Sequence, residues 1–198
     1  MRKITISLLI LLFSSSCVEL ALLTSVKTAD IAVREKSLSD SGKDIAISGK
    51  LVKELTINKL KMPSNMVDVT VNEGRVLLTG VVDEEKKARK AVDIAWKVKN
   101  VKEVIDEIQV VENFRVFRTS KQYLKDTAIT CNISSKLLFA KNIPSVNYSV
   151  ITVNNIVYLL GVAGSNAEIN KVSNLAAKAN GVTRVVSHVI LKNDRRRG

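Results

Sequence analysis

The sequence is poor in the residues on which most catalytic and metal sites depend. Its 198 residues include one histidine, two cysteines, one tryptophan and two prolines, and aromatic residues make up only 4%. Metal clusters, histidine-based triads and disulfide scaffolds need more of these side chains than the chain supplies. The scarcity of aromatic residues also weighs against a platform for stacking nucleic-acid bases. No convergent set of acid, base or nucleophile is evident, so we expect no catalytic activity, metal or cofactor.

What the chain has in excess is positive charge, and the excess is uneven. The net charge is +12 at pH 7, which favours anionic partners such as a membrane surface, an acidic protein or nucleic acid. Residues 43–113 carry 13 basic and 12 acidic side chains, a net charge of +1. Residues 120–198 carry 11 basic and 3 acidic side chains, a net charge of +8. The C-terminal half therefore holds most of the positive field.

The N-terminus predicts export followed by attachment of lipid. A basic start and an apolar stretch over residues 4–13, too short to span a bilayer, indicate a signal peptide over residues 1–16. The ending is similar to a bacterial lipobox, which predicts Cys17 as the lipid-attachment residue, although Ser14 stands where lipoboxes usually carry leucine. Two alternatives stay open: an ordinary signal peptide, and a disulfide between Cys17 and Cys131. Export argues against a nucleic-acid partner.

The rest of the chain repeats itself at about 81 residues, which indicates two copies of one module. The matched positions are Asp44 with Asp126, Pro63 with Pro144, Gly80 with Gly161, and Val101 with Val182. The proline-to-glycine and glycine-to-valine spacings are identical in the two copies. The predicted organisation is a lipidated tether (17–42), a first copy (43–112), a linker (113–122), a second copy (123–192) and a basic tail (193–198).

Each copy shows the same order of hydrophobic patterns. Asp44 and Asp126 are candidate N-caps of helices with apolar residues at every fourth position. Alternating apolar residues around a short turn then predict a hairpin, with asparagine at the second turn tolerating positive φ. A second amphipathic helix and a final alternating strand complete each copy. The prediction is an α+β chain of two αββαβ modules, each with two helices packed on a three-stranded mixed sheet.

These residues carry a family resemblance. The pattern Val69-x-Val71-x-x-Gly74-x-Val76-x-Leu78-x-Gly80, followed by a helix and Asn100-Val101-x-x-Val104, is similar to the BON domain. The second copy resembles it as well, with a hairpin turn that we expect to be one residue shorter. The expected structural glycines are Gly74, Gly80, Gly161 and Gly181.

Two BON copies behind a lipobox resemble the dual-BON outer-membrane lipoproteins of Gram-negative bacteria, the DolP type. The resemblance implies a non-enzymatic protein in the outer membrane that is lipid-anchored, faces the periplasm, binds anionic phospholipid and supports membrane integrity. It also implies partners among proteins of outer-membrane assembly or division. The alternative is a soluble, chaperone-like or stress-response dual-BON protein of the periplasm.

The first helix of the second copy is the candidate lipid-binding element. Its face opposite the core carries no charge, and in a module of net charge +8 such a face suits shallow insertion beside phosphate headgroups. The predicted phospholipid-binding residues are Lys125, Ala128, Cys131, Ser135, Lys136, Leu138, Phe139 and Lys141. Alternatively, Leu138 and Phe139 pack against the first copy. Ala128 stands where proteins of the DolP type often carry tryptophan, which is the preferred interfacial anchor.

Two other basic features have a plain interpretation. His188 lies in the last strand with no cysteine or carboxylate near it in sequence, which predicts a residue on the strand surface rather than a metal ligand. Arg195-Arg196-Arg197 is a run of charge and predicts a solvated tail, with contact to lipid phosphates as the alternative.

Overall fold

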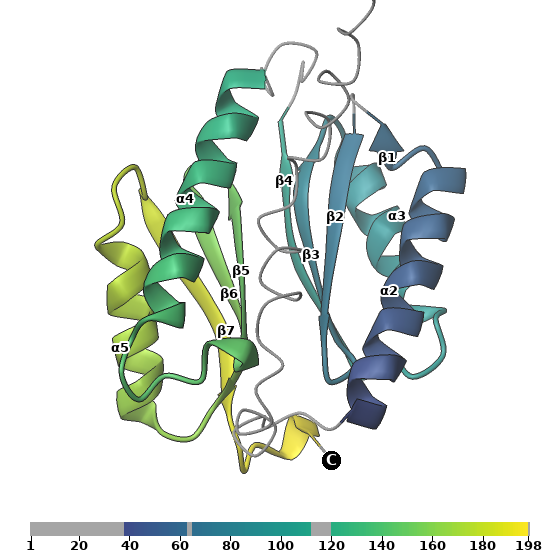
Figure 1. The fold of residues 1–198 in the computed structure, drawn as a ribbon. Coiled ribbons are helices and arrows are strands. Elements are labelled where there is room, and N and C mark those ends of the chain that lie inside the picture. The colour runs from purple at the N-terminus through teal and green to yellow at the C-terminus, as the bar shows by residue number, and fades with distance from the viewer. Residues whose placement is uncertain (1–37, 63–64, 112–119, 198) are drawn as a thin grey trace, which may run out of the picture. The chain divides into compact units, whose positions relative to one another are not determined.

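The computed structural model describes residues 38–62, 65–111 and 120–197 (Figure 1). Its elements, in chain order, are α2 (Leu38–Ile57), β1 (Lys61–Met62), β2 (Asn65–Asn72), β3 (Arg75–Val82), α3 (Glu85–Trp96), β4 (Glu103–Val110), α4 (Ser120–Leu138), η3 (Ser145–Asn147), β5 (Tyr148–Val153), β6 (Ile156–Ala163), α5 (Asn166–Ala177), β7 (Arg184–Leu191) and η4 (Arg195–Arg197). We call α2 to β4 the first module and α4 to η4 the second module.

The two modules have the same topology. In the first module β3 pairs antiparallel with β2 and parallel with β4, and in the second module β6 pairs in the same way with β5 and β7. The helix between the last two strands makes the crossover that a parallel pair requires. This confirms the predicted α+β class and the αββαβ order. The first sheet also gains a two-residue strand, β1, at the outer edge of β2, which the sequence patterns did not indicate.

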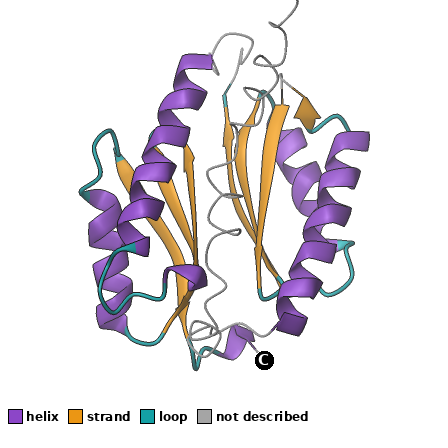
Figure 2. Cartoon of the chain, viewed as in Figure 1, coloured by secondary structure: helices purple, strands orange, loops and turns teal. Residues whose placement is uncertain are grey.

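Each module buries its own core between two helices and one face of its sheet (Figure 2). The apolar residues predicted at every fourth position are all buried, namely Ile47, Leu51 and Leu55 in α2 and Ile129, Ile133 and Leu137 in α4. Burying a side chain of this size stabilises the fold by roughly 1.5–3 kcal/mol. The helical stripe therefore fixes which side of each helix faces the sheet, and by exclusion which side faces outward.

The opposite faces of the two sheets form a third apolar cluster that joins the modules. Leu77 and Val81 of β3 and Tyr158 and Leu160 of β6 are each at most 1% exposed and belong to this cluster. Because neighbouring residues of a strand point to opposite faces, β3 is buried on both sides along its whole length. Burial of Tyr158 raises the pKa of its hydroxyl. The modules thus meet through their sheets, and their helices take no part in this cluster.

The structure corrects the expected role of Asp44 and Asp126. Neither is an N-cap, because α2 begins at Leu38 and α4 at Ser120. Each carboxylate instead accepts hydrogen bonds from both backbone N–H groups of its module's hairpin turn. Asp44 accepts them at 2.7 and 2.8 Å, and Asp126 at 2.8 and 2.9 Å. Both side chains are buried, so each turn is tied to the middle of a helix.

The hairpin turns have equal length, contrary to the expectation of a shorter second turn. Each has two residues, Glu73-Gly74 in the first module and Asn154-Asn155 in the second. All four have positive φ, between 51° and 78°, as two-residue turns that match the twist of a hairpin require. The N–H groups of such a turn point inward together, which is why one carboxylate can accept both.

Two of the expected structural glycines allow strands to approach closely. A Cβ on Gly80, whose φ is +115°, would lie 1.8 Å from the carbonyl oxygen of Met66 on the neighbouring strand. A Cβ on Gly161 would lie 2.3 Å from the carbonyl oxygen of Asn147. These glycines occupy equivalent positions, so both modules leave the same space at the same point of the hairpin.

Candidate functional site

The outer face of α4 is open to solvent. Leu138 and Phe139 are 56% and 83% exposed, so they do not pack against the first module. Ala128 and Ser135 are exposed as well, and Cys131 is half-buried. The physical reason is the use of the sheets for the contact between modules, which leaves the helices on the outside. The packing alternative is therefore wrong for this face, and the structure brings the predicted apolar residues together.

The apolar stripe extends one turn further than the sequence indicated. Leu124 is 65% exposed, and it lies four residues before Ala128 on the same face of the helix. The sequence does not reveal Leu124, because aspartate is a common N-cap residue. Asp126 therefore predicts a helix that begins after Leu124. The spacing of Leu124, Ala128, Cys131, Ser135 and Leu138 is the available signal, since steps of three and four residues mark one helical face.

Exposed lysines flank this stripe. Lys125 and Lys136 lie on the side of α4 next to the stripe, with Lys121 one turn before them, and Lys141 follows in the turn after the helix. Lys121 is a further residue that the sequence pattern did not single out. None of the four forms an ion pair with any residue in the described part of the chain. Their ammonium groups are therefore available to external anions.

The acidic residues of the second module are directed elsewhere. Asp126 is held under the hairpin turn. Glu168 accepts a hydrogen bond from the hydroxyl of Tyr148 and another from the backbone N–H of Gly164 at 3.0 Å. Burial and this carboxylate raise the pKa of Tyr148 above its ordinary value. Asp194 pairs with Arg196 at 2.8 Å. Within residues 120–197, then, no carboxylate lies on the exposed face of α4.

Two of the three C-terminal arginines, Arg196 and Arg197, contact the first module, contrary to the interpretation from sequence as a solvated tail, whereas Arg195 is exposed. The guanidinium of Arg197 donates two hydrogen bonds to the carboxylate of Glu73 in the first module, at 2.7 and 2.8 Å. Arg196 lies 3.5 Å from Glu103, also in the first module. Lys102 donates to the backbone carbonyl of Arg197 at 2.8 Å. This end of the chain holds the two modules together.

His188 also lies at this junction, rather than on a free strand surface. Its Nε2 is 2.9 Å from a carboxylate oxygen of Glu107. Its backbone carbonyl accepts a hydrogen bond from the fully buried Arg75 at 3.0 Å, and Arg75 pairs with Glu103 at 2.5 Å. Burial acts to raise the pKa of Glu103, but the hydrogen bond and charge of Arg75 outweigh it and hold the pKa below its ordinary value. No local pattern marks the contacts of His188, because its partners lie 81 and 113 residues away along the chain.

Several expectations fall on residues outside the described ranges. Cys17, the signal peptide and the predicted tether up to residue 37 are not among the described residues. Cys131 is not a free thiol in the structure, which favours the disulfide alternative over lipid attachment at Cys17. Lipid attachment at Cys17 stays a prediction. Over the described ranges, no helix is both long and apolar enough to cross a membrane. The same residues contain no group of three or more histidine, cysteine and acidic side chains arranged to hold a metal ion.

Comparison with known proteins agrees with the duplicated architecture. The family model "BON domain" matches residues 43–112 and again residues 125–193. An uncharacterized protein in the gshII 5' region of Anaplasma centrale is 41% identical over 154 residues, which cover 78% of this chain and 98% of that protein. Osmotically-inducible protein Y of Escherichia coli is 31% identical over 142 residues, covering 72% of this chain and 69% of that protein. Outer membrane lipoprotein DolP of Haemophilus influenzae is 24% identical over 186 residues, covering 94% of each chain.

Proposed function

The chain belongs to the BON-domain family, and from this premise we propose that it is an envelope protein that binds anionic phospholipid through the outer face of α4. One observation carries the proposal: an uncharged helical face that is open to solvent and lined on one side by exposed lysines. No catalytic step and no cofactor are part of it. The binding surface consists of the eight residues predicted from the sequence, together with Lys121 and Leu124.

The energetics of this surface fit shallow insertion. Leu124, Leu138 and Phe139 lose their contact with water when the helix settles among headgroups and upper acyl carbons, and each contributes about 1 kcal/mol for partial burial. Each lysine near an anionic surface adds about 1 kcal/mol, which falls with rising salt. Apolar contact and charge act on the same side of the helix, which is the arrangement of interfacial helices.

We further propose a location in the cell envelope, with Cys17 as the anchor in the outer membrane and the modules on the periplasmic side. The support is the lipobox-like ending of residues 1–17 and the similarity to outer membrane lipoprotein DolP over 94% of the chain. The proposal extends to a role in membrane integrity, with partners in outer-membrane assembly or division, as the resemblance to dual-BON lipoproteins implies. The mass of the mature N-terminal peptide, with and without globomycin, tests acylation of Cys17.

The second candidate is a soluble stress-response or chaperone-like protein of the periplasm. The observation in its favour is 31% identity to osmotically-inducible protein Y. The two candidates differ in whether the N-terminus is acylated and in whether the protein is found in the membrane or the soluble fraction. A mature chain without acyl groups, found in the soluble fraction and unable to bind vesicles, would favour the second candidate.

The binding proposal is tested by flotation of vesicles with a chain that begins at Val18, which lacks Cys17 and therefore carries no lipid. Vesicles of phosphatidylcholine with phosphatidylglycerol or cardiolipin should retain the chain, and phosphatidylcholine alone should retain little. Leu138→Glu with Phe139→Glu should weaken retention at least about tenfold, because apolar contact is lost and two negative charges face the bilayer. The thermal midpoint should stay nearly unchanged, since both side chains are exposed.

The matched control is Ile45→Glu with Ile57→Glu on α2, where the side chains are 73% and 64% exposed. This pair brings the same charge change to an equally exposed helix of the first module, so retention should match that of the unaltered chain. Equal weakening by both pairs would show that net charge alone governs binding. Such a result would remove α4 as the binding surface.

A further inference from the structure

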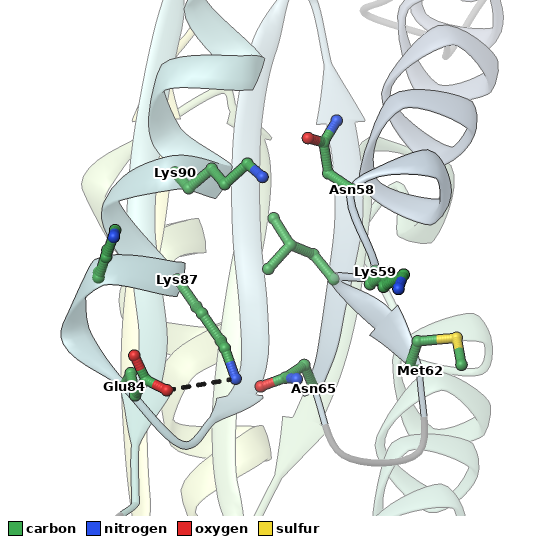
Figure 3. Close-up of a pocket in the computed structure, with 9 residues that line it drawn as sticks. Asn58, Lys59, Met62, Asn65, Glu84, Lys87 and Lys90 are labelled. Carbon is green, nitrogen blue, oxygen red and sulfur yellow. Dashed lines mark ion pairs between the residues drawn. The ribbon is translucent and has the colours of Figure 1, made fainter.

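The first module contains a hollow of about 450 Å³ between the end of α2 and the start of α3 (Figure 3). Its apolar part is Leu60, which is almost fully buried, and Met62, which is 45% exposed. The residues around it are Asn58, Lys59, Leu60, Met62, Asn65, Glu84, Lys86, Lys87 and Lys90. Four ammonium groups therefore surround a largely apolar floor together with a single carboxylate.

The charges in this lining are not balanced. Lys87 pairs with Asp83 at 2.5 Å and lies 3.7 Å from Glu84. Lys59, Lys86 and Lys90 form no ion pair with any residue over the ranges that the structure describes. Figure 3 shows Lys87 and Lys90 reaching from α3 across the hollow toward Asn65 and Asn58. Like charges gathered around one space repel each other, and an anion between them removes that cost.

The second module provides an internal comparison. At the position equivalent to the hollow, its side chains form hydrogen bonds with residues of the same module. The repeat aligns Lys87 with Glu168 and Lys90 with Lys171. Glu168 is hydrogen-bonded to the hydroxyl of Tyr148, and Lys171 donates to the backbone carbonyl of Lys141 at 2.7 Å. In the first module Val67 stands where the second has Tyr148, so no hydroxyl reaches this corner.

The backbone at the start of α3 favours an anion, whereas the carboxylates of Asp83, Glu84 and Glu85 in the same segment oppose it. Glu84 occupies the N-cap position, and its side chain makes no capping hydrogen bond, whereas Ser165 caps the equivalent α5 through the N–H of Glu168. The N-terminal N–H groups of a helix and its dipole both favour an anion. The uncapped start of α3 is secondary to the lysines and the hollow, which define the site.

We propose that the hollow binds a small anion in which a phosphate group is joined to an apolar group, with Lys86, Lys87 and Lys90 at the phosphate and Leu60 and Met62 at the apolar part. A phosphate ester of glycerol that carries a short acyl chain matches both the charge and the apolar floor of the hollow. This site lies on the first module and does not depend on the proposed role of α4.

The test is a titration of the ¹⁵N-labelled mature chain followed by amide shifts. Three probes distinguish the source of the phosphate: inorganic phosphate, glycerol 3-phosphate, and dihexanoyl phosphatidylglycerol below its micellar concentration. We expect saturable shifts at residues 84–90 with the last two probes. Tighter binding of the short lipid would identify a lipid as the source of the phosphate, and equal affinities would contradict the proposed apolar contact with Leu60 and Met62.

Lys86→Gln with Lys90→Gln should weaken this binding about tenfold, because two ammonium groups next to the phosphate are lost. The control, Lys97→Gln with Lys99→Gln, removes the same charge at the other end of α3 and should change affinity less than about twofold. Absence of saturable shifts, or equal weakening by both pairs, would overturn the proposal. Leu138→Glu with Phe139→Glu should leave this titration unchanged, so failure of the α4 proposal is scored separately.

Discussion

Replacing Arg197 with alanine tests whether the C-terminus holds the two modules together. The guanidinium of Arg197 meets the carboxylate of Glu73 through two parallel hydrogen bonds, at 2.7 and 2.8 Å. Their side chains are 19% and 8% exposed. The carboxylate is therefore nearly shielded from water, and water cannot fully replace the arginine once it is gone. The cost should exceed that of an exposed ion pair.

The magnitude follows from this shielding. An exposed pair contributes about 0–1 kcal/mol, and breaking a fully buried pair costs about 3–5 kcal/mol. Glu73 and Arg197 lie between these limits, and hydrogen bonds to charged groups contribute about 1.5–3 kcal/mol. We expect Arg197→Ala to lower the free energy of unfolding by about 2 kcal/mol. For a chain of this size, that change lowers the melting temperature by about 4–8 °C.

The assay is urea unfolding followed by circular dichroism, with Arg195→Ala as the control. Arg195 belongs to the same short helix, is exposed, and forms no ion pair within the described residues. Its replacement should change stability by less than about 0.5 kcal/mol. The double variant Arg197→Ala with Glu73→Gln should lose less than the sum of the single variants, because they remove the same contact. Equal losses for the two arginines, or strict additivity, would refute the reasoning.

Three further predictions concern the scaffold. Gly80→Ala should cost at least about 3 kcal/mol of unfolding free energy, because its Cβ would meet the carbonyl oxygen of Met66, whereas Gly49→Ala in exposed helix should gain about 0.5–1 kcal/mol. Asp126→Asn should cost about 1–3 kcal/mol in urea unfolding, since an amide oxygen cannot replace both acceptors of a buried turn. The lowered pKa of Glu103 contributes stability that is complete above the ordinary value of 4.5 and lost as pH falls through the lower folded value. Glu103→Gln should therefore reduce the loss of unfolding free energy as the pH falls below 4.5. An unchanged pH dependence would show that other carboxylates cause this loss.

The elements within each module could be predicted from the sequence because their signals are local. Ile129, Ile133 and Leu137 recur at the period of a helix, and burial of one face of the helix then leaves the opposite face outside. The residues of that opposite face, including Leu138 and Phe139, follow from the same spacing. The repeat strengthened the prediction, because two copies with equal spacings rarely arise from unrelated folds.

The errors concern groups whose partners lie far away along the chain. Aspartate is a common N-cap residue, and only the structure shows that the carboxylate of Asp126 binds the turn of Asn154 and Asn155, 28 and 29 residues later. Because the predicted helix began at Asp126, Leu124 was not recognised as part of its outer face. Arg197 and its partner Glu73 are 124 residues apart, and a run of arginines gives no sign of a distant carboxylate.

The αββαβ order of each module, its core and the uncharged face of α4 were determined by the sequence alone, because residue spacing dictates them. Whether that face is open was decided only by the tertiary structure. The back of each sheet is apolar enough to meet the other sheet, and this contact places the helices outside. The same contact brings Arg75, Glu103, Glu107 and His188 together, and it is a property of two surfaces that no single stretch of sequence contains.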